Sequence, residues 1–280
     1  MKTLGIHHVT AITADAERNI DFYTGILGLR LVKLTVNFDD PESYHLYYGD
    51  ELGRPGTIMT FFAWPEGRRG RIGPPQVTVT SFAAPVGSMD YWSVRLSRHG
   101  VGIASPASRF GEPVLAFADS DGMKVEIIGV AEADPSALSG GPVPAEHTLR
   151  GFHSVTVSEE GYESTAGLLT ELMGFHPVSD EGNRFRYRAA GDEKASTVDL
   201  LCVPDAPRGS MGTGIVHHVA FRTPDDSQQL AWREAIVRQS FNVSPVMDRS
   251  YFHSIYFREP GGVLFEIATD APGFAVDESP

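Results

Sequence analysis

One segment occurs twice in this chain, 210 residues apart, and it constrains the fold more than any other feature. The first copy is Gly5-Ile6-His7-His8-Val9, and the second is Gly214-Ile215-Val216-His217-His218-Val219. A strand-like run follows each histidine pair, and an aspartate lies seven positions after the second histidine, at Asp15 and Asp225. Self-similarity of this kind indicates a chain built from repeated structural units.

Four stretches of the chain share one predicted order of elements, and together they define the fold class. They cover roughly residues 5–64, 75–131, 149–204 and 213–270, and each has a strand, a helix and then further strands. Apolar residues recur at helical spacing over 16–27, and helices are expected at 87–99, 162–173 and 226–239. A unit of about 55 residues is too small to bury its sheet alone, so the units should pair. We therefore predict an α+β fold of four βαβββ modules in two tandem domains.

The boundary between the two domains is expected near the middle of the chain. Residues 132–146 are rich in Ala, Pro, Gly and Ser, a composition typical of a linker. We predict an N-terminal domain over residues 1–131, a linker over 132–148 and a C-terminal domain over 149–280. Each domain would then hold two modules.

Charge and cysteine content exclude several classes of function. The formal net charge is −13 and the isoelectric point is near 5.2, so we expect no nucleic-acid partner and no binding to anionic membranes. Cys202 is the one cysteine, which excludes an intramolecular disulfide and favours a reducing, cytoplasmic location. We see no apolar stretch of signal-peptide or membrane-spanning length. With ten histidines and one cysteine, a metal site would use nitrogen and oxygen ligands.

The repeated histidines and one carboxylate suggest such a metal site. The second copy leads to an apolar strand, 261–267, which contains Glu266. Two histidines and one carboxylate are the ligands of non-haem iron(II) sites with open coordination positions. Because side chains alternate along a strand, His8 and His7 lie on opposite faces, and the repeat alone does not decide which one points into the site. The alternative is that these are ordinary strand histidines, but a carboxylate in an apolar strand is costly unless it is paired or metal-bound.

At the level of whole motifs, the chain resembles the vicinal oxygen chelate superfamily, which includes glyoxalase I, bleomycin-resistance proteins and extradiol dioxygenases. The resemblance covers almost the whole chain and extends to ring-cleaving dioxygenases that act on hydroquinones. The residues that carry it are His7–Thr10, Val36–Pro41, Tyr44–Asp50 and Pro260–Thr269. It implies strongly curved mixed sheets.

The resemblance also implies roles for individual residues. The superfamily's ligand histidine lies seven residues before the acidic residue of the strand-to-helix turn, which selects His8 and His218, and Glu266 matches the carboxylate ligand. Iron(II) is the expected metal, and manganese(II) suits the same ligands. The residues that it places beside the ligands or near the substrate are His7, Thr10, His217, Arg249 and Tyr256.

Two of these residues have plain structural alternatives. Arg249 would stabilise an anionic intermediate, but it could instead form a surface ion pair with Asp248 or Glu259. Tyr256 would donate a hydrogen bond to a substrate oxygen, but it could instead be a half-buried strand aromatic. The roles of His45 and His253 stay open, and a packed structural role is the better expectation for His45.

The middle modules lack a complete ligand set. Aligned by sequence, the position of His8 becomes Val77 in the second module and Ser154 in the third. Glu126 and Asp199 keep a carboxylate, and His153 matches His217 rather than His218. We therefore expect one metal site, formed by the first and last modules, and a structural role for Glu126.

The resemblance implies a ring-cleaving dioxygenase that uses O2 to open a hydroquinone- or catechol-type aromatic, so its partners would be a small aromatic substrate and O2. The last strand of the first module, 58–61, has no carboxylate, so a fourth ligand of the glyoxalase type is missing. A glyoxalase-type lyase or isomerase is the first alternative, and a non-catalytic protein that binds a small aromatic or a drug is the second. Edge strands of such sheets can pair between chains, which would allow a homo-oligomer.

Overall fold

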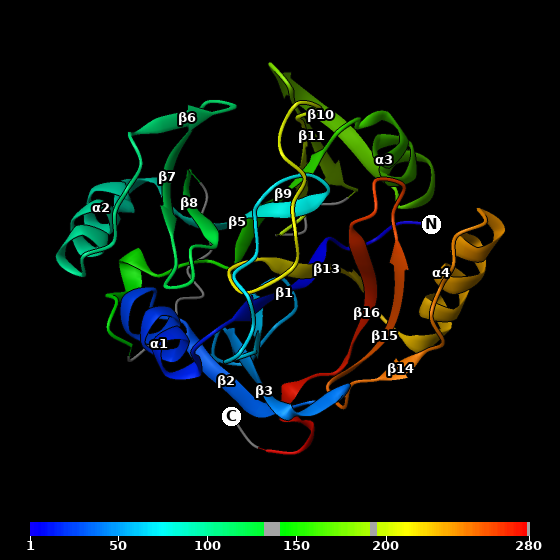
Figure 1. The fold of residues 1–280 in the computed structure, drawn as a ribbon, viewed down its shortest axis with the longest axis horizontal. Coiled ribbons are helices and arrows are strands. Elements are labelled where there is room, and N and C mark those ends of the chain that lie inside the picture. The colour runs from blue at the N-terminus through cyan, green and yellow to red at the C-terminus, as the bar shows by residue number, and fades with distance from the viewer. Residues whose placement is uncertain (132–140, 191–194, 279–280) are drawn as a thin grey trace.

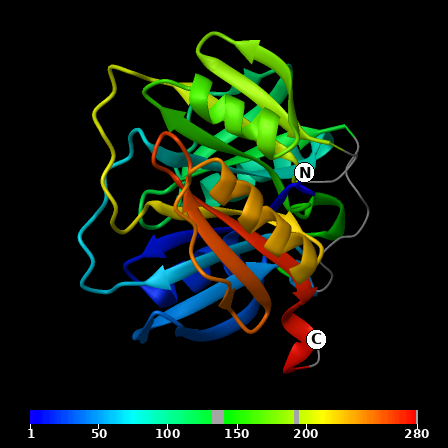
Figure 2. The ribbon, with the colours of Figure 1, turned by 90° about the vertical axis from the view of Figure 1, so that its right-hand side faces the viewer.

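The computed structural model describes residues 1–131, 141–190 and 195–278, and two curved mixed sheets dominate them (Figure 1). Each sheet has eight strands. The four α-helices lie on the outside of the sheets, and Figure 2 shows one sheet above the other. The predicted α+β class and its strongly curved mixed sheets are confirmed.

The first sheet joins the two ends of the chain. Its strand order is β14-β15-β16-β13-β1-β4-β3-β2. At its centre β1 pairs antiparallel with β13, so the two copies of the His-His-Val repeat lie side by side. The strands are β1 (Ile6–Thr13), β2 (Arg30–Asn37), β3 (Asp40–Gly49), β4 (Ile58–Ala63), β13 (Val216–Thr223), β14 (Met247–Asp248), β15 (Phe252–Arg258) and β16 (Leu264–Pro272).

The second sheet has the same arrangement and is built from the middle of the chain. Its order is β10-β11-β12-β9-β5-β8-β7-β6, with β5 and β9 antiparallel at the centre. The strands are β5 (Gln76–Pro85), β6 (Ala107–Arg109), β7 (Glu112–Ala118), β8 (Lys124–Val130), β9 (Phe152–Glu159), β10 (Phe175–Glu181), β11 (Arg184–Ala189) and β12 (Thr197–Cys202).

The sheets do not follow the predicted division into residues 1–131 and 149–280. Each sheet takes one module from either side of the linker, because β1 pairs with β13 and β5 pairs with β9. Of the predicted linker, 132–140 lies outside the described residues. Its described part packs against the fold: Val143 is buried, and the Trp92 indole donates a hydrogen bond to the His147 carbonyl (2.9 Å).

The helices begin where the sequence predicts them. α1 (Ala16–Ile20) and α4 (Asp226–Arg238) are capped by the repeated aspartates, whose carboxylates accept from the backbone N–H of Arg18 and Gln228. The aspartate of each repeat is therefore a helix cap. α1 and α3 (Glu163–Gly167) each continue into a π-helical turn, Asp21–Ile26 and Leu168–Leu172, and α2 spans Met89–Arg98.

Two strands at the edges of the sheets are short. In the fourth module, residues 243–249 form only β14, with one isolated bridge between Val243 and Phe257. Pro245 explains this, because proline has no N–H to donate to a ladder. The short edge strand β6 was not predicted, since its three residues show no apolar alternation.

Among the described residues, the larger of two hydrophobic clusters links both sheets and the helices. It includes the fully buried Trp92 of α2 and Trp232 of α4 together with apolar residues from the strands of both sheets. Among the described residues, no helix is both long and apolar enough to cross a membrane.

Candidate metal centre

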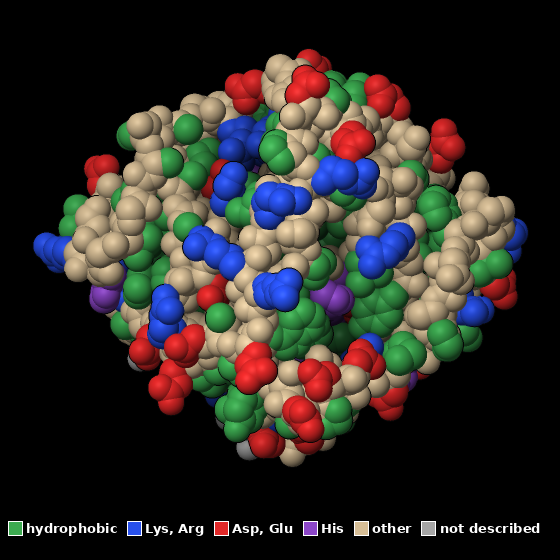
Figure 3. Space-filling view, in the orientation of Figure 1, with side chains coloured by type: hydrophobic (Ala, Val, Ile, Leu, Met, Phe, Trp, Pro, Cys, Tyr) green, Lys and Arg blue, Asp and Glu red, His purple; other side chains and the backbone are tan. Residues whose placement is uncertain are grey.

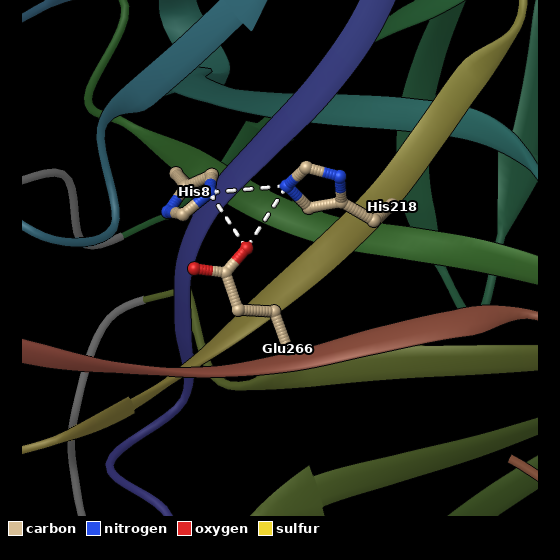
Figure 4. A group of neighbouring side chains, drawn as sticks. All are labelled: His8, His218 and Glu266. Atoms are coloured by element: carbon tan, nitrogen blue, oxygen red, sulfur yellow. Dashed lines mark hydrogen bonds and ion pairs between the residues drawn. The ribbon is translucent and has the colours of Figure 1, made fainter. Parts of the chain in front are cut away.

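Three adjacent strands bring His8, His218 and Glu266 to one point (Figure 4). His8 of β1 lies opposite Ala220 of β13, and Ala220 lies beside Glu266 of β16. His218 is two residues before Ala220 and therefore shares its face. The side chains of His8, His218 and Glu266 thus emerge on one face of the sheet. The Nε2 atoms of the histidines are 3.4 Å apart, and Glu266 Oε2 lies 3.3 Å from His8 Nε2 and 2.9 Å from His218 Nε2. All three residues are at least 96% buried.

These donor atoms fit a divalent metal ion. Ligand atoms about 2.1 Å from a metal and at right angles to one another are about 3.0 Å apart, close to the separations found here. Glu266 Oε2 is buried and makes no hydrogen bond, although both histidines are near, whereas Oε1 accepts from Ser254 (2.5 Å). A buried carboxylate oxygen without a partner is costly, and a metal ion would satisfy it.

The second ring nitrogen of each ligand histidine is held by the preceding histidine. His7 Nδ1 lies 2.9 Å from His8 Nδ1, and His217 Nδ1 lies 2.7 Å from His218 Nδ1. A neutral histidine that offers Nε2 to a metal carries its proton on Nδ1, so His8 and His218 donate and their neighbours accept. The repeated pair therefore fixes the tautomer and the ring orientation of each ligand.

Burial favours the neutral form of three histidines at this site, and the two candidate ligand histidines favour the ionised form of Glu266. Desolvation, and then the adjacent ligand histidine, lowers the pKa of His7 far below its usual range and that of His217 to about 3. Desolvation also lowers the pKa of His218. For Glu266, burial alone would raise the pKa, but His8 and His218 outweigh it and hold the pKa well below the ordinary value.

A small pocket lies directly beside the candidate ligands. Its volume is about 30 Å³. Pockets that bind small molecules usually measure about 300–1,000 Å³, so the site is nearly closed in this structure. The lining residues are His8, Thr10, Asn37, Phe38, Asp39, His45, Tyr47, Phe62, His218, Arg249, Phe252 and Tyr256.

Arg249 and Tyr256 lie together on the wall of this pocket. Arg249 Nε donates to the Tyr256 hydroxyl (3.3 Å), and its guanidinium forms a two-point ion pair with Asp39. The ion pairs considered from sequence, with Asp248 or Glu259, are not the ones that form. Desolvation, and then Glu266, raises the pKa of Tyr256, which keeps its phenol protonated.

A chain of hydrogen bonds leads from the pocket into the first sheet. The Thr60 hydroxyl donates to Thr10 (3.0 Å), His45 Nε2 lies 2.8 Å from Thr60 Oγ1, and Tyr47 lies 2.8 Å from His45 Nδ1. His45 packs on Tyr47, with ring centroids 4.0 Å apart, and also lines the pocket. Because Thr10 accepts from Thr60, its own proton is available to the pocket.

The other sequence candidates lie away from this centre. His253 is paired with Asp226 at the start of α4 (2.6 Å). Glu126 forms a two-point ion pair with Arg109 (2.5 and 2.7 Å), as its expected structural role requires. Within the described ranges, His8, His218 and Glu266 are the one group with metal-ligand spacing.

One alignment is corrected by the strand register. β1 has two bulges, one between Ile6 and His8 and one after Thr10. β5 has the same two bulges, one between Val77 and Val79 and one after Ser81. The position of His8 in the second module is therefore Val79, not Val77. The absence of a ligand there is unchanged.

Sequence reasoning missed the apolar wall and the lid of the pocket. Phe252 packs against the His7 and His8 rings, with centroids 5.0 and 4.9 Å away. Phe38 and Asp39 form the turn between β2 and β3, and both line the pocket. The quoted segment Val36–Pro41 was the available signal, but it does not show where the turn lies.

Comparison with known proteins establishes the family. The model of the Glyoxalase/Bleomycin resistance protein/Dioxygenase superfamily matches residues 5–127 and 151–267, which together make up most of the chain. The chain therefore belongs to this superfamily. The two matches correspond to the two sequence halves on either side of the predicted linker.

Individual relatives are dioxygenases by name. The chain is 49% identical to "Putative ring-cleaving dioxygenase MhqO" of Bacillus subtilis, over 99% of this chain and 88% of that protein. It is 36% identical to chlorohydroquinone/hydroquinone 1,2-dioxygenase of Sphingobium indicum, over 99% and 88%. A crystal structure from Bacillus subtilis superposes with a TM-score of 0.95 at 48% identity, over 99% of this chain and 89% of that one.

Proposed function

We propose that this protein is a metal-dependent dioxygenase that uses O2 to open the ring of a hydroquinone- or catechol-type aromatic. The observation that carries the proposal is the buried cluster of His8, His218 and Glu266 on one face, with no fourth His, Cys, Asp or Glu ligand beside it among the described residues. Three ligands leave coordination positions for a phenolate and O2. The named dioxygenase relatives support the same reaction.

Iron(II) is the metal that we propose for this centre, and manganese(II) would bind the same donors. Bound there, it would bring phenolate and O2 together and let electron density pass from the ring to O2. His8, His218 and Glu266 would hold it, and His7 and His217 would fix the two ligand imidazoles. The surrounding side chains do the remaining work of binding, orientation and proton transfer.

Three pocket residues supply the polar contacts to the substrate in this proposal. The Tyr256 phenol, kept protonated, donates a hydrogen bond to a substrate oxygen. The Arg249 guanidinium is a fixed cation that stabilises negative charge on the opening ring. The Thr10 hydroxyl, whose lone pair is occupied by Thr60, offers its proton on the other side of the pocket.

Substrate entry requires the turn between β2 and β3 to move. The pocket of about 30 Å³ cannot admit an aromatic ring. Phe38 and Asp39 line the pocket and are 43% and 61% exposed, so they can shift without opening the core. Displacement of this turn would enlarge the pocket and release Arg249 from Asp39 for the substrate.

The deciding experiment is anaerobic reconstitution with iron(II), followed by O2 uptake with hydroquinone, chlorohydroquinones and catechol in parallel. Uptake coupled to ring opening with one ring class supports the proposal and names the substrate. The His218→Ala variant should bind little metal and take up no O2, and full turnover by it would refute the assignment. Bound metal without uptake on any ring would instead favour the lyase alternative, to be tested on thiol adducts of oxoaldehydes.

We also propose a cytoplasmic location and allow for a homo-oligomer. Cys202 is a free, partly buried thiol, which suits a reducing compartment. The outermost strands of the sheets, β2, β14, β6 and β10, have an open edge at which another chain could pair. Light scattering on the purified protein would give the oligomeric state.

A further inference from the structure

The second sheet has a position equivalent to each element of the metal centre. In the first sheet, Glu266 lies beside Ala220, two positions after His218. In the second sheet, Asp199 lies beside Thr156, two positions after Ser154. The carboxylate is thus kept, and the two histidines are replaced by Val79 and Ser154. No metal can be held there by this set of side chains.

Arginines neutralise the carboxylates of the second sheet. Arg186 lies at the position of Tyr256, opposite Asp199, and binds both of its oxygens (2.7 and 3.0 Å). Arg109 binds both oxygens of Glu126, one of which also accepts from Ser81 (2.9 Å). The carboxylates are therefore fully occupied, and they do not repel an incoming anion as free acidic groups would.

A cavity far larger than the metal-site pocket lies over this network. Its volume is about 620 Å³, within the range of about 300–1,000 Å³ that is usual for small-molecule sites. Its walls are mostly apolar, with Val79, Phe117 and Leu201 among them, and its charged lining is Arg109, Lys124, Arg184 and Glu126. Figure 3 shows several Lys and Arg side chains over the central part of one face of the molecule, with acidic side chains along both its upper and its lower edge.

Two cations of this lining keep donors free for a ligand. Arg184 is partly buried, and only its Nη1 has partners among the described residues, Thr156 (2.8 Å) and Asp199 (3.3 Å). The Lys124 side chain is exposed on β8 and makes no ion pair or hydrogen bond within the described part of the chain. Guanidinium and ammonium groups beside an apolar wall match a molecule with one carboxylate and an apolar body.

We propose that this cavity is a second small-molecule site, which binds a compact organic carboxylate of the size of benzoate. Its carboxylate contacts Lys124 and the free edge of Arg184, and its apolar body lies against Val79 and Phe117. The site is separate from the metal centre, which lies on the other sheet, and it does not depend on the reaction proposed for that centre.

Calorimetric titration of the metal-loaded protein with benzoate tests the site, with benzamide as its neutral analogue. We expect one benzoate per chain and much weaker binding of benzamide. Lys124→Met should weaken benzoate binding at least about tenfold, the effect of losing one charged hydrogen bond, whereas Lys2→Met, at another exposed lysine, should not. Ala104→Trp, at the rim of the cavity, should abolish binding, and Ala107→Trp on β6, outside the lining, should not.

A titration of the His218→Ala variant separates this site from the metal centre. Benzoate binding that persists in this variant supports the second site, because a carboxylate bound to the metal would be lost with it. The proposal is overturned if benzoate does not bind, if benzamide binds equally well, if Lys124→Met and Ala104→Trp leave the affinity unchanged, or if binding disappears in His218→Ala.

Discussion

Arg249 and Asp39 are joined by a two-point ion pair across the mouth of the metal-site pocket. Nη1 lies 3.2 Å from Oδ1, and Nη2 lies 2.8 Å from Oδ2. Asp39 follows β2 and Arg249 follows β14, which are the two outermost strands of the first sheet. The pair therefore connects opposite edges of one curved sheet, and it holds the turn that narrows the pocket.

Asp39→Asn should loosen this turn at little cost to the fold. Asp39 is 61% exposed, and ion pairs of this kind contribute less than about 1 kcal/mol. We expect kcat/KM for the aromatic substrate to rise by about two- to fivefold. The gain in free energy cannot exceed the free energy of the ion pair that is released. Steady-state kinetics with a thermal melt checks this, and a tenfold fall in kcat/KM would show that Asp39 itself assists the reaction.

Replacement of His217 should weaken the metal centre through His218. His217→Asn removes the ring that fixes the His218 tautomer, and loss of such a partner typically costs about 10–100-fold in metal affinity or activity. His153 occupies the equivalent position in the second sheet, so His153→Asn is a matched control. Metal titration should separate the two variants, and equal affinities would contradict the role given to His217.

Tyr256→Phe should reduce turnover with little change in metal content. The Tyr256 side chain is partly buried and its phenol is bonded to Arg249, and a positioned proton donor contributes about 10²–10⁴-fold to a rate. The loss should appear in kcat, because the hydroxyl is assigned to the reacting substrate oxygen and not to the metal. Metal analysis and single-turnover kinetics on the same sample provide the test; an unchanged kcat would leave Tyr256 a packing residue.

A carboxylate pair between the sheets makes stability dependent on pH. Glu159 ends β9 and is 1% exposed, while Glu259 follows β15 and accepts from the backbone of Gly261 (2.9 Å) and Val263 (2.7 Å). Desolvation, and then repulsion from Glu259, raises the pKa of Glu159 from 4.5 to about 8. The folded protein therefore holds a proton that the unfolded chain releases, so stability falls as the pH rises between these values.

Glu159→Gln should remove this dependence. We expect it to raise the free energy of unfolding at pH 8.5 by on the order of 1–3 kcal/mol and to have little effect near pH 4. Denaturant unfolding across this pH range measures both quantities. Glu171→Gln, at an exposed helical position, serves as the control. If the free energy of unfolding depends on pH in the same way in Glu159→Gln and in the unmodified protein, the proton is not held by Glu159.

Removal of the metal should destabilise the fold by mass action. A ligand at about 100 times its Kd contributes about 2.7 kcal/mol, and for a chain of this length that corresponds to about 3–6 °C in Tm. A chelator should therefore lower the melting temperature of the reconstituted protein. The Glu266→Gln variant should not respond, because its site lacks the carboxylate; an equal fall in both proteins would indicate a different metal site.

The spacing of residues along the chain predicted the features that depend on residues close in sequence. Asp15 and Asp225 recur where a helix must be capped, and strand alternation together with the repeat limited the ligand choice to one histidine of each pair. The structure then brought His8, His218 and Glu266 together as the family resemblance implied. Spacing along one strand determines which residues share a face, whereas the family resemblance selected His8 and His218 over their neighbours.

The remaining features depend on which strand edges meet, and spacing does not encode this. Apolar patterning did not show that β1 pairs with β13 rather than β5, since both carry similar apolar runs, and only the expected metal site joined the first and last modules. The contact between Asp39 and Arg249 follows from that pairing and from the curvature of the sheet. The matching bulges of β1 and β5 place the equivalent of His8 at Val79, two residues from the position that the sequence alignment gave.

The pairing of the first and last modules makes the metal centre depend on strands that are far apart in the sequence. His8 lies on β1, whereas His218 and Glu266 lie on β13 and β16. Every strand of the second sheet lies between them in the chain, from β5 to β12. A chain cut before β16 would therefore keep all the residues of the second sheet and lose the carboxylate of the metal centre.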